Sequence, residues 1–298
     1  MLCPPAQSPP VPETICALVE HYRTERARSG DALSVAFFGG MAPTRDMLDS
    51  IGDLPFSARV RPDLLSRARA DALVARGATG IELDVGTFDD FALRWCGRPY
   101  TSSRVAEMAE GLRERGLRVG IVLTPGLPGT DFETAKRDAA RAAELAHTVR
   151  LQPALVLARS KLHEMYDAGR YPPLTTDIAV ETCLQMMEIL EPRGVTVIRV
   201  GAQPGPDGMG RLVAGPYHPS LRELVESKRA QNSLRRQIAA LEAPSSIVIR
   251  CAASDETRAR GPANANLRLF RVEFALVHVV VKSDPALQRG QWAVEKIA

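Results

Sequence analysis

Clustered cysteines are missing from this sequence of 298 residues. Its five cysteines are Cys3, Cys16, Cys96, Cys183 and Cys251, and no two are close enough to form a cluster-binding loop. Cysteines without a pairing pattern are typical of a reducing compartment, so the sequence predicts a cytoplasmic protein.

Long hydrophobic runs are also missing. No stretch of roughly 18 apolar residues occurs, so the sequence predicts no membrane-spanning helix and no membrane partner. Residues 1–10 have neither a basic start nor an apolar stretch, so we expect no signal peptide. Hydrophobic residues still make up 45% of the chain, which is ordinary for a protein with a real core.

Lysine is scarce, because only five of the 38 basic residues are lysine and the other 33 are arginine. Arginine favours phosphate binding, since its planar guanidinium matches phosphate oxygens. A GC-rich coding sequence gives the same bias, and no basic cluster stands out. The net charge of +3 is too small to indicate nucleic-acid binding by itself.

Short apolar runs alternate with helical patterns from residue 14 to residue 200. This alternation, with short turns, predicts an α/β fold in which helices cover a parallel sheet. A partial (βα)6 TIM-like barrel fits best, and its ligand chemistry is expected at the C-terminal ends of the strands. The predicted strands are 33–38, 56–60, 80–85, 118–123, 149–156 and 196–200. The predicted helices are 14–27, 64–76 with Asp63 as N-cap, 105–115, 132–146 and 178–191.

Three regions follow from this pattern. Residues 1–13 are rich in proline and are expected to be irregular, and residues 14–215 form the barrel. Residues 216–298 begin with a long polar helix and continue with two short strands, which predicts a small α+β appendage.

Two short segments at strand ends are candidate sites. Gly39-Gly40 ends the first strand, and such a pair leaves backbone groups open to a ligand or simply makes a tight turn. Glu82, Asp84 and Gly86 share one face of the third strand. Their carboxylates are candidates for acid, base or ligand groups, with an ion pair to Arg59 or Arg61 as the structural alternative.

The loop after the fourth strand is a further candidate. Residues 123–129 contain Pro125-Gly126 and Pro128-Gly129, which fix an exposed backbone against which a planar ligand can lie. An ordinary connecting loop explains the same residues. His163-Glu164 lacks the second histidine of a zinc motif, and His218 fits a capping or packing role better than a functional one.

These segments together resemble the radical S-adenosylmethionine (SAM) superfamily. The resemblance is to the branch related to the Elongator catalytic subunit and oxygen-independent coproporphyrinogen oxidase, and more closely to stand-alone bacterial members of unassigned substrate. It extends over nearly the whole chain beyond residue 33. The segments that carry it are 35–40, 81–83, 88–90, Gly97-Arg98 with Thr101, Gly120, 125–129, 164–166, 169–171, 198–201 with Gln203-Pro204, 215–220, 223–227 and Arg260-Gly261 with Asn264 and Asn266.

The resemblance implies a partial barrel with a 4Fe–4S cluster, held by a C-x-x-x-C-x-x-C loop, that splits SAM into a 5′-deoxyadenosyl radical. It implies that Gly39 and Gly40 meet the SAM amino group, and that Arg98 and the turn around Gly126 lie near the SAM carboxylate and adenine. The expected cofactor-binding residues are Gly39, Gly40, Glu82, Arg98, Gly126 and Pro128.

The chain departs from the family pattern at several of these positions. The cysteine loop is absent, and Cys3 is at most a relic of its last ligand, so no metal ligand is expected. Met41 follows the glycine pair where a small hydroxyl or acidic residue is usual. Asp84 and Gly86 replace a small residue and a polar amide residue.

Three interpretations remain open. The first is a degenerate or truncated homologue without a cluster, acting through a small-molecule ligand or a protein partner. The second is an active radical SAM enzyme whose cluster loop lies upstream. The third is a protein that binds transfer RNA or other nucleic acid, with Arg235-Arg236 and Arg258 and Arg260 contacting phosphates.

Loss of the first barrel strand leaves an exposed sheet edge. We expect residues 1–13 or a second subunit to cover it.

Overall fold

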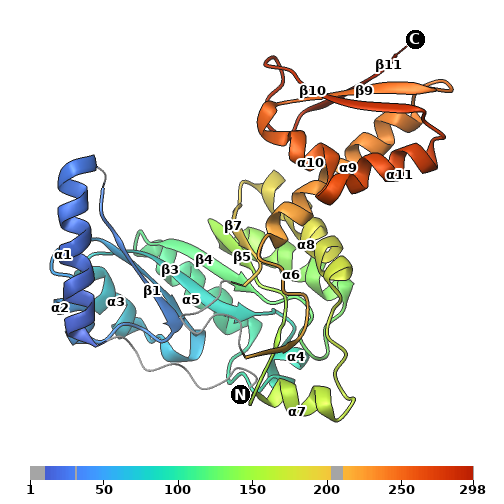
Figure 1. Cartoon of the computed structure of the whole chain (residues 1–298). Helices are drawn as coiled ribbons and strands as arrows, with labels where there is room; N and C mark the ends of the chain where they lie inside the picture. Colours follow the sequence, from blue (N-terminus) through green and yellow to red (C-terminus); the bar gives the residue numbers. More distant parts are fainter. Residues whose placement is uncertain (1–10, 31, 203–210, 298) are drawn as a thin grey trace. The chain divides into compact units, whose positions relative to one another are not determined.

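The structure is a computed structural model that describes residues 11–30, 32–202 and 211–297. Six strands form one parallel sheet in the order β1-β2-β3-β4-β5-β7, so the predicted α/β class is confirmed (Figure 1). The strands are β1 (Val35–Gly40), β2 (Phe56–Val60), β3 (Ala78–Gly86), β4 (Arg118–Leu123), β5 (Thr148–Leu151) and β7 (Thr196–Val200).

Helices cover one face of this sheet. Alternate residues of each strand are apolar and buried against the helices, as Ile81, Leu83 and Val85 of β3 show. The helices that contact the strands are α3, α5, α6 and α8. The helices of this unit are α1 (Pro12–Ser29), α2 (Arg45–Asp49), α3 (Arg67–Ala75), α4 (Asp90–Trp95), α5 (Ser102–Glu114), α6 (Phe132–Leu145), α7 (Lys161–Asp167) and α8 (Thr176–Leu190).

Side-chain caps define where the covering helices begin. The hydroxyls of Ser66, Thr101 and Thr175 accept backbone N–H groups at the starts of α3, α5 and α8, and the Asp131 carboxylate does so for α6. The predicted cap Asp63 is wrong, because the segment Pro62–Leu64 forms a separate 3-10 turn before Ser66. α1 begins at Pro12, within the segment predicted to be irregular, since proline is compatible with a first helical turn.

The predicted fifth strand, 149–156, is wrong in its second half. β5 ends at Leu151, and Pro153 has no N–H with which to continue the ladder. The chain then forms β6 (Val156–Leu157), which pairs antiparallel with β8 (Leu212–Ala214) in a separate two-stranded sheet.

The six-stranded sheet is strongly curved. The guanidinium of Arg150 on β5 lies 5.5 Å from the ring centroid of Phe38 on β1, and Arg59 on β2 donates to Gln152, just beyond β5, at 3.0 Å. In a flat sheet, β1 and β5 would be about 19 Å apart, four strand spacings. Side chains meet across that span only if the sheet closes part-way into a barrel, so we call it the half-barrel.

β1 is a terminal strand of the half-barrel, and its outer edge pairs with no other strand of the described residues. Most of the segment predicted to cover this edge lies in residues 1–10, outside the described residues. Between α1 and β1, an apolar cavity of about 270 Å³ is lined by Ile15, Val19 and Phe37, among others. No helix within residues 11–30, 32–202 and 211–297 has the length and apolarity needed to cross a membrane.

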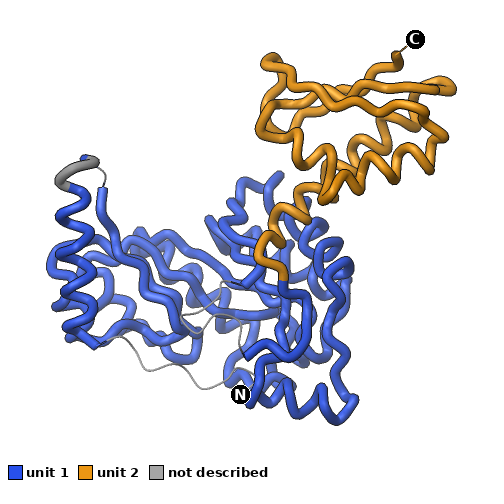
Figure 2. The backbone as a smooth tube through the Cα atoms, viewed as in Figure 1, with its two compact units in different colours: residues 1–217 blue, residues 218–298 orange. Residues whose placement is uncertain are grey.

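The chain divides into two compact units, residues 1–217 and 218–298 (Figure 2). In the second unit, three strands in the order β10-β9-β11 pack with three helices around buried Ile249, Phe270 and Leu234. The segment between β9 and β10 is mostly helical. The elements are α9 (Leu221–Ala239), β9 (Ser246–Cys251), α10 (Glu256–Arg260), α11 (Ala265–Glu273), β10 (His278–Ser283) and β11 (Trp292–Lys296).

Candidate functional site

A polar inner face lies opposite the helices in the half-barrel. Alternation along β2, β3 and β5 places Arg59, Glu82, Asp84 and Arg150 there, all half-buried, with Gln152 just beyond β5. A closed barrel fills its interior with branched aliphatic side chains. Charged side chains at these positions make the inner face a candidate surface for a polar ligand.

The inner-face carboxylates are paired. Asp84 Oδ2 lies 3.1 Å from Arg59 Nη2, so the structural alternative of an ion pair holds for Asp84. Glu82 instead accepts two bonds from Arg150, at 3.1 and 2.9 Å. Arg61, the other predicted partner, is engaged by Asp63.

Gly120 makes the Glu82–Arg150 pair possible. It lies on β4 between Glu82 on β3 and Thr148 on β5. A methyl group at Gly120 would lie 2.8 Å from Glu82 Cγ and 3.0 Å from Thr148 Oγ1. Because Gly120 has no side chain, the side chain of Glu82 can pass over β4 and reach Arg150.

Gly39 and Gly40 end β1 with φ angles of +142° and +77°, which residues other than glycine rarely adopt. The Asp84 carboxylate lies beside this turn, 3.8 Å from the Cβ position of Gly40. Met41 follows with a half-exposed side chain. The glycine turn thus has a carboxylate next to it, supplied by β3 rather than by the residue after the turn.

Tyr100 supports the end of β3. Its hydroxyl donates to the carbonyl oxygens of Asp84 and Val85, at 3.2 and 3.1 Å. Burial raises the pKa of Tyr100, and the charge of Arg98 opposes this rise, so Arg98 lies within electrostatic range of the same strand end. Arg98 is half-buried, and its backbone N–H donates to Leu93.

The loop after β4 joins this region. The Gly86 carbonyl accepts from Thr124 N–H at 2.7 Å, and a methyl group at Gly86 would lie 3.3 Å from Leu127. Contacts therefore connect Gly40, Asp84, Gly86 and Leu127 at the C-terminal ends of β1, β3 and β4. We call this region the mouth.

Segments distant in sequence fix the shape of that loop. Tyr171 donates to the Gly126 carbonyl at 2.6 Å, and Leu174 lies so close that a methyl group on Gly126 would meet it at 2.7 Å. Gly126 remains half-buried, whereas Pro128 is buried and offers little surface to a ligand.

The two histidines singled out in the sequence lie elsewhere. His163 is paired with Asp167 at 3.4 Å on α7. His218 accepts from the backbone N–H of Ser220 at 3.1 Å, a local hydrogen bond just before α9.

Asp138 on α6 supports the loop after β3, and no sequence pattern pointed to it. It is buried, and it accepts from Phe88 N–H at 2.7 Å and from Thr87 in the loop after β3. Burial raises the pKa of Asp138 to about 6, against the opposing effect of these hydrogen bonds. No sequence motif marks this residue, because its partners lie 50 positions away.

The described residues do not fit an iron–sulfur cluster. They contain no group of three or more histidine, cysteine or acidic residues able to hold a metal, and Cys3 lies outside them. Burial raises the pKa of the Cys183 and Cys251 thiols to about 12 and about 11. Metal ligation needs thiolates, so neither cysteine suits it.

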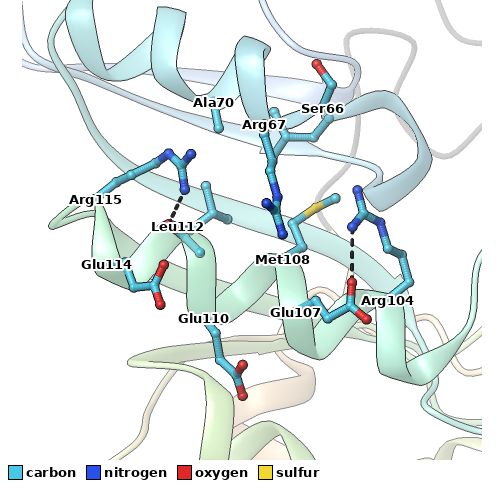
Figure 3. Close-up of a pocket in the computed structure, with 12 residues that line it drawn as sticks. Ser66, Arg67, Ala70, Arg104, Glu107, Met108, Glu110, Leu112, Glu114 and Arg115 are labelled. Carbon is cyan, nitrogen blue, oxygen red and sulfur yellow. Dashed lines mark hydrogen bonds and ion pairs between the residues drawn. The ribbon is translucent and has the colours of Figure 1, made fainter.

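A separate cavity of about 290 Å³ lies between α3 and α5 (Figure 3). Several of its charged groups are already engaged, Arg104 with Glu107 and Arg115 with Asp71 and the Gly111 carbonyl. It lies among the helices and shares no residue with the inner face, so we assign the candidate site to the inner face and the mouth.

The fold defines a half-barrel α/β protein, and the polar inner face and the mouth are its candidate ligand surface. Comparison with solved structures supports this fold: a structure of archaeal Methanocaldococcus infernus Elp3 with an N-terminal deletion matches with a TM-score of 0.63 at 21% identity, covering 74% of this chain and 60% of that chain.

Sequence comparisons then place the chain. Residues 146–231 match the Radical SAM C-terminal domain family. A tRNA uridine(34) acetyltransferase of Methanocaldococcus jannaschii is 30% identical over 144 residues, 47% of this chain and 26% of that protein. Human Elongator complex protein 3 is 25% identical over 225 residues, 71% of this chain and 39% of that protein. The predicted relationship to the Elongator branch of the radical SAM superfamily is confirmed.

The chain spans only about a quarter to two fifths of the length of these curated relatives.

Proposed function

We propose that this chain is a binding protein built on the radical SAM scaffold, which holds SAM or a close adenosyl relative at the mouth and uses none of its described cysteines for radical chemistry. The carrying observation is the convergence of Gly40, Asp84 and Gly86 with the loop after β4. Parallel α/β folds bind ligands at such strand ends.

The charges at the mouth suit the methionine end of SAM. The carboxylate of Asp84, beside the Gly39-Gly40 turn, is the candidate partner of the ammonium group. Arg98 is the candidate partner of the ligand carboxylate, because a guanidinium binds a carboxylate through two hydrogen bonds. The half-buried backbone at Gly126 is the candidate contact for the adenine ring.

Isothermal titration with SAM, S-adenosylhomocysteine and adenosine tests this proposal. We expect binding of SAM by the full chain, weakened about tenfold by Asp84→Asn, since a charge-assisted hydrogen bond is worth roughly 1.5–3 kcal/mol. Arg104→Gln, on the outer surface of α5, is the matched control and should bind normally. Absence of binding of all three ligands, or equal binding by the wild type and Asp84→Asn, would refute the proposal.

Iron and sulfide analysis after anaerobic reconstitution tests the second half of the proposal. We expect substoichiometric iron, because the described cysteines are not grouped. About four irons per chain, the content of one 4Fe–4S cluster, would instead support the active-enzyme interpretation.

A second candidate function is binding of transfer RNA, favoured by the charge of the second unit. Residues 218–298 contain 13 lysine and arginine against 8 aspartate and glutamate residues, a net charge of +5. Arg258 does not contribute to a phosphate surface, since it is buried and paired with Glu223 and Asp255. Gel-shift titration should show affinity for transfer RNA that falls steeply with salt; salt-independent binding would contradict this function.

A further inference from the structure

Arg199 reaches the inner face through an irregularity in β7. Val197 is buried on the helix side, so strict alternation would send Arg199 into the same apolar core. The register instead shifts: Val149 pairs with Val197, but Arg150 pairs with Arg199 and Leu151 with Val200. Ile198 is the extra residue of a β-bulge, and bulges are a means of re-aiming a side chain. The bulge returns Val200 to the core and places Arg199 beside Arg150.

The result is two arginines opposite each other on adjacent strands. Like charges at such positions repel. Arg150 is compensated by Glu82, to which it donates two hydrogen bonds, whereas Arg199 forms no ion pair within the described parts of the chain. Its Nε is buried without a hydrogen-bond partner, as is the Nε of Arg59 on the same face, so the missing counter-charge is what distinguishes Arg199.

Within the described residues, Arg199 therefore adds to the inner face a half-buried positive charge that no carboxylate compensates. Arg59 and Arg150 are matched by Asp84 and Glu82. Arg118 on β4 also has no counter-charge among the described residues, but it is exposed to solvent, whereas Arg199 is half-buried. Buried polar atoms are rarely left without a partner in folded proteins, so an unpaired guanidinium nitrogen calls for an explanation. An anionic ligand supplies both the missing charge and the missing acceptor.

We propose that Arg199, together with Thr148 and Thr196, forms a phosphate-binding subsite on the inner face at the β5–β7 side of the half-barrel. Thr148 and Thr196 are register partners on the same face. Hydroxyl donors beside a planar guanidinium fork match the several oxygens of a phosphate group. This subsite is separate from the mouth and does not depend on SAM binding there, because SAM carries no phosphate.

The test uses the full chain and three phosphate probes: inorganic phosphate, adenosine monophosphate and transfer RNA. We expect inorganic phosphate to raise the melting temperature in a saturable way, beyond sodium chloride at equal ionic strength. Arg199→Gln should weaken phosphate binding about tenfold, the loss of one charge-assisted contact. Arg104→Gln should leave it unchanged.

The stability of the variant without ligand separates a binding role from a structural one. Arg199→Gln removes an uncompensated charge beside Arg150, so the free protein should be at least as stable as the wild type. Arg199→Lys retains the charge but not the fork, and should bind phosphate more weakly than the wild type. Equal phosphate stabilisation of the wild type and Arg199→Gln, no binding of any probe, or a clear loss of stability in Arg199→Gln would each overturn the proposal.

The remaining arms identify the source of the phosphate. Tighter binding of adenosine monophosphate than of inorganic phosphate, with transfer RNA binding unaffected by Arg199→Gln, assigns the subsite to a phosphorylated small molecule. Transfer RNA binding that is weakened by Arg199→Gln and displaced by inorganic phosphate assigns it to an RNA backbone. SAM affinity should be unchanged in Arg199→Gln, so failure of SAM binding and failure of this subsite are separate results.

Discussion

Replacing Gly120 by alanine tests whether the half-barrel depends on Glu82 crossing β4. The added methyl group would lie 2.8 Å from Glu82 Cγ and 3.0 Å from Thr148 Oγ1, distances at which atoms must move. Overpacking of this kind costs about 1–3 kcal/mol. Glu82 Cγ is in the middle of its side chain, so relief of the contact turns the carboxylate away from Arg150. The loss of this half-buried pair adds to the packing cost.

Urea denaturation followed by circular dichroism measures the effect. We expect Gly120→Ala to lower the free energy of unfolding by about 2–4 kcal/mol, the overpacking cost plus the cost of separating two half-buried charges. Gly111→Ala is the matched control: Gly111 lies inside α5, and the nearest atom to a new methyl group is the flexible end of Arg115, at 3.3 Å. Alanine at Gly111 should stabilise by about 0.5–1 kcal/mol through helix propensity.

A double-mutant cycle identifies the cause. If Gly120→Ala acts by breaking the pair, its cost should shrink in a Glu82→Gln, Arg150→Gln background, where the pair is already gone. A Gly120→Ala variant as stable as the wild type would refute the reasoning. An undiminished cost in the double background would attribute the effect to packing alone.

Three further predictions concern other supports of the fold. Burial raises the pKa of Asp138 to about 6 from an unfolded value of 3.8, so the wild type should lose about 3 kcal/mol of stability relative to Asp138→Asn as the pH rises from about 4 to 6. Denaturation at several pH values measures this loss, and a difference that does not change with pH would contradict it. Tyr171→Phe removes the hydroxyl that donates to the Gly126 carbonyl, so stability should fall by about 1–2 kcal/mol and amide exchange in the loop 124–129 should accelerate. Unchanged exchange would argue against Tyr171 as the anchor of this loop. Arg258→Ala removes the ion-pair partner of the buried Asp255 carboxylate and should lower the stability of the second unit by about 3–5 kcal/mol. Arg235→Ala, at an exposed pair with Glu273, should lower it by less than about 1 kcal/mol. Similar losses in the two variants would show that burial does not decide the strength of these pairs.

Local pattern accounts for what the sequence could predict of the fold. A strand turns alternate residues to opposite faces, and a helix repeats every 3.6 residues. Short stretches of sequence are therefore enough to predict the apolar strand β4 and the helices α6 and α8. The predicted boundaries were wrong where residues outside the local pattern determine the structure. The strand predicted through residue 156 stops at Leu151 because the ladder meets Pro153, and Ser66 rather than Asp63 caps α3 because a 3-10 turn intervenes.

The candidate site was only partly open to sequence reasoning. Gly39, Gly40 and Gly126 were visible because glycine next to a strand end marks a special backbone, and these positions do have positive φ. Alternation along 148–152 would also have placed Arg150 and Gln152 on the face of Thr148, but no local signal says what they contact. Asp138 could not be found at all, because its partners come from another part of the chain.

The sequence by itself therefore determined the α/β class, the six strands of the parallel sheet with their main covering helices, and the glycine turns, since each follows from a local period or a local steric property. Only the tertiary structure decided which charges are matched. Glu82 meets Arg150, 68 positions away, because the sheet curves and Gly120 leaves room. A one-residue bulge places Arg199 on the same face, where no described residue supplies its counter-charge. Coulombic pairing depends on distance in space, and distance in space is set by curvature and register, which no short stretch of sequence encodes.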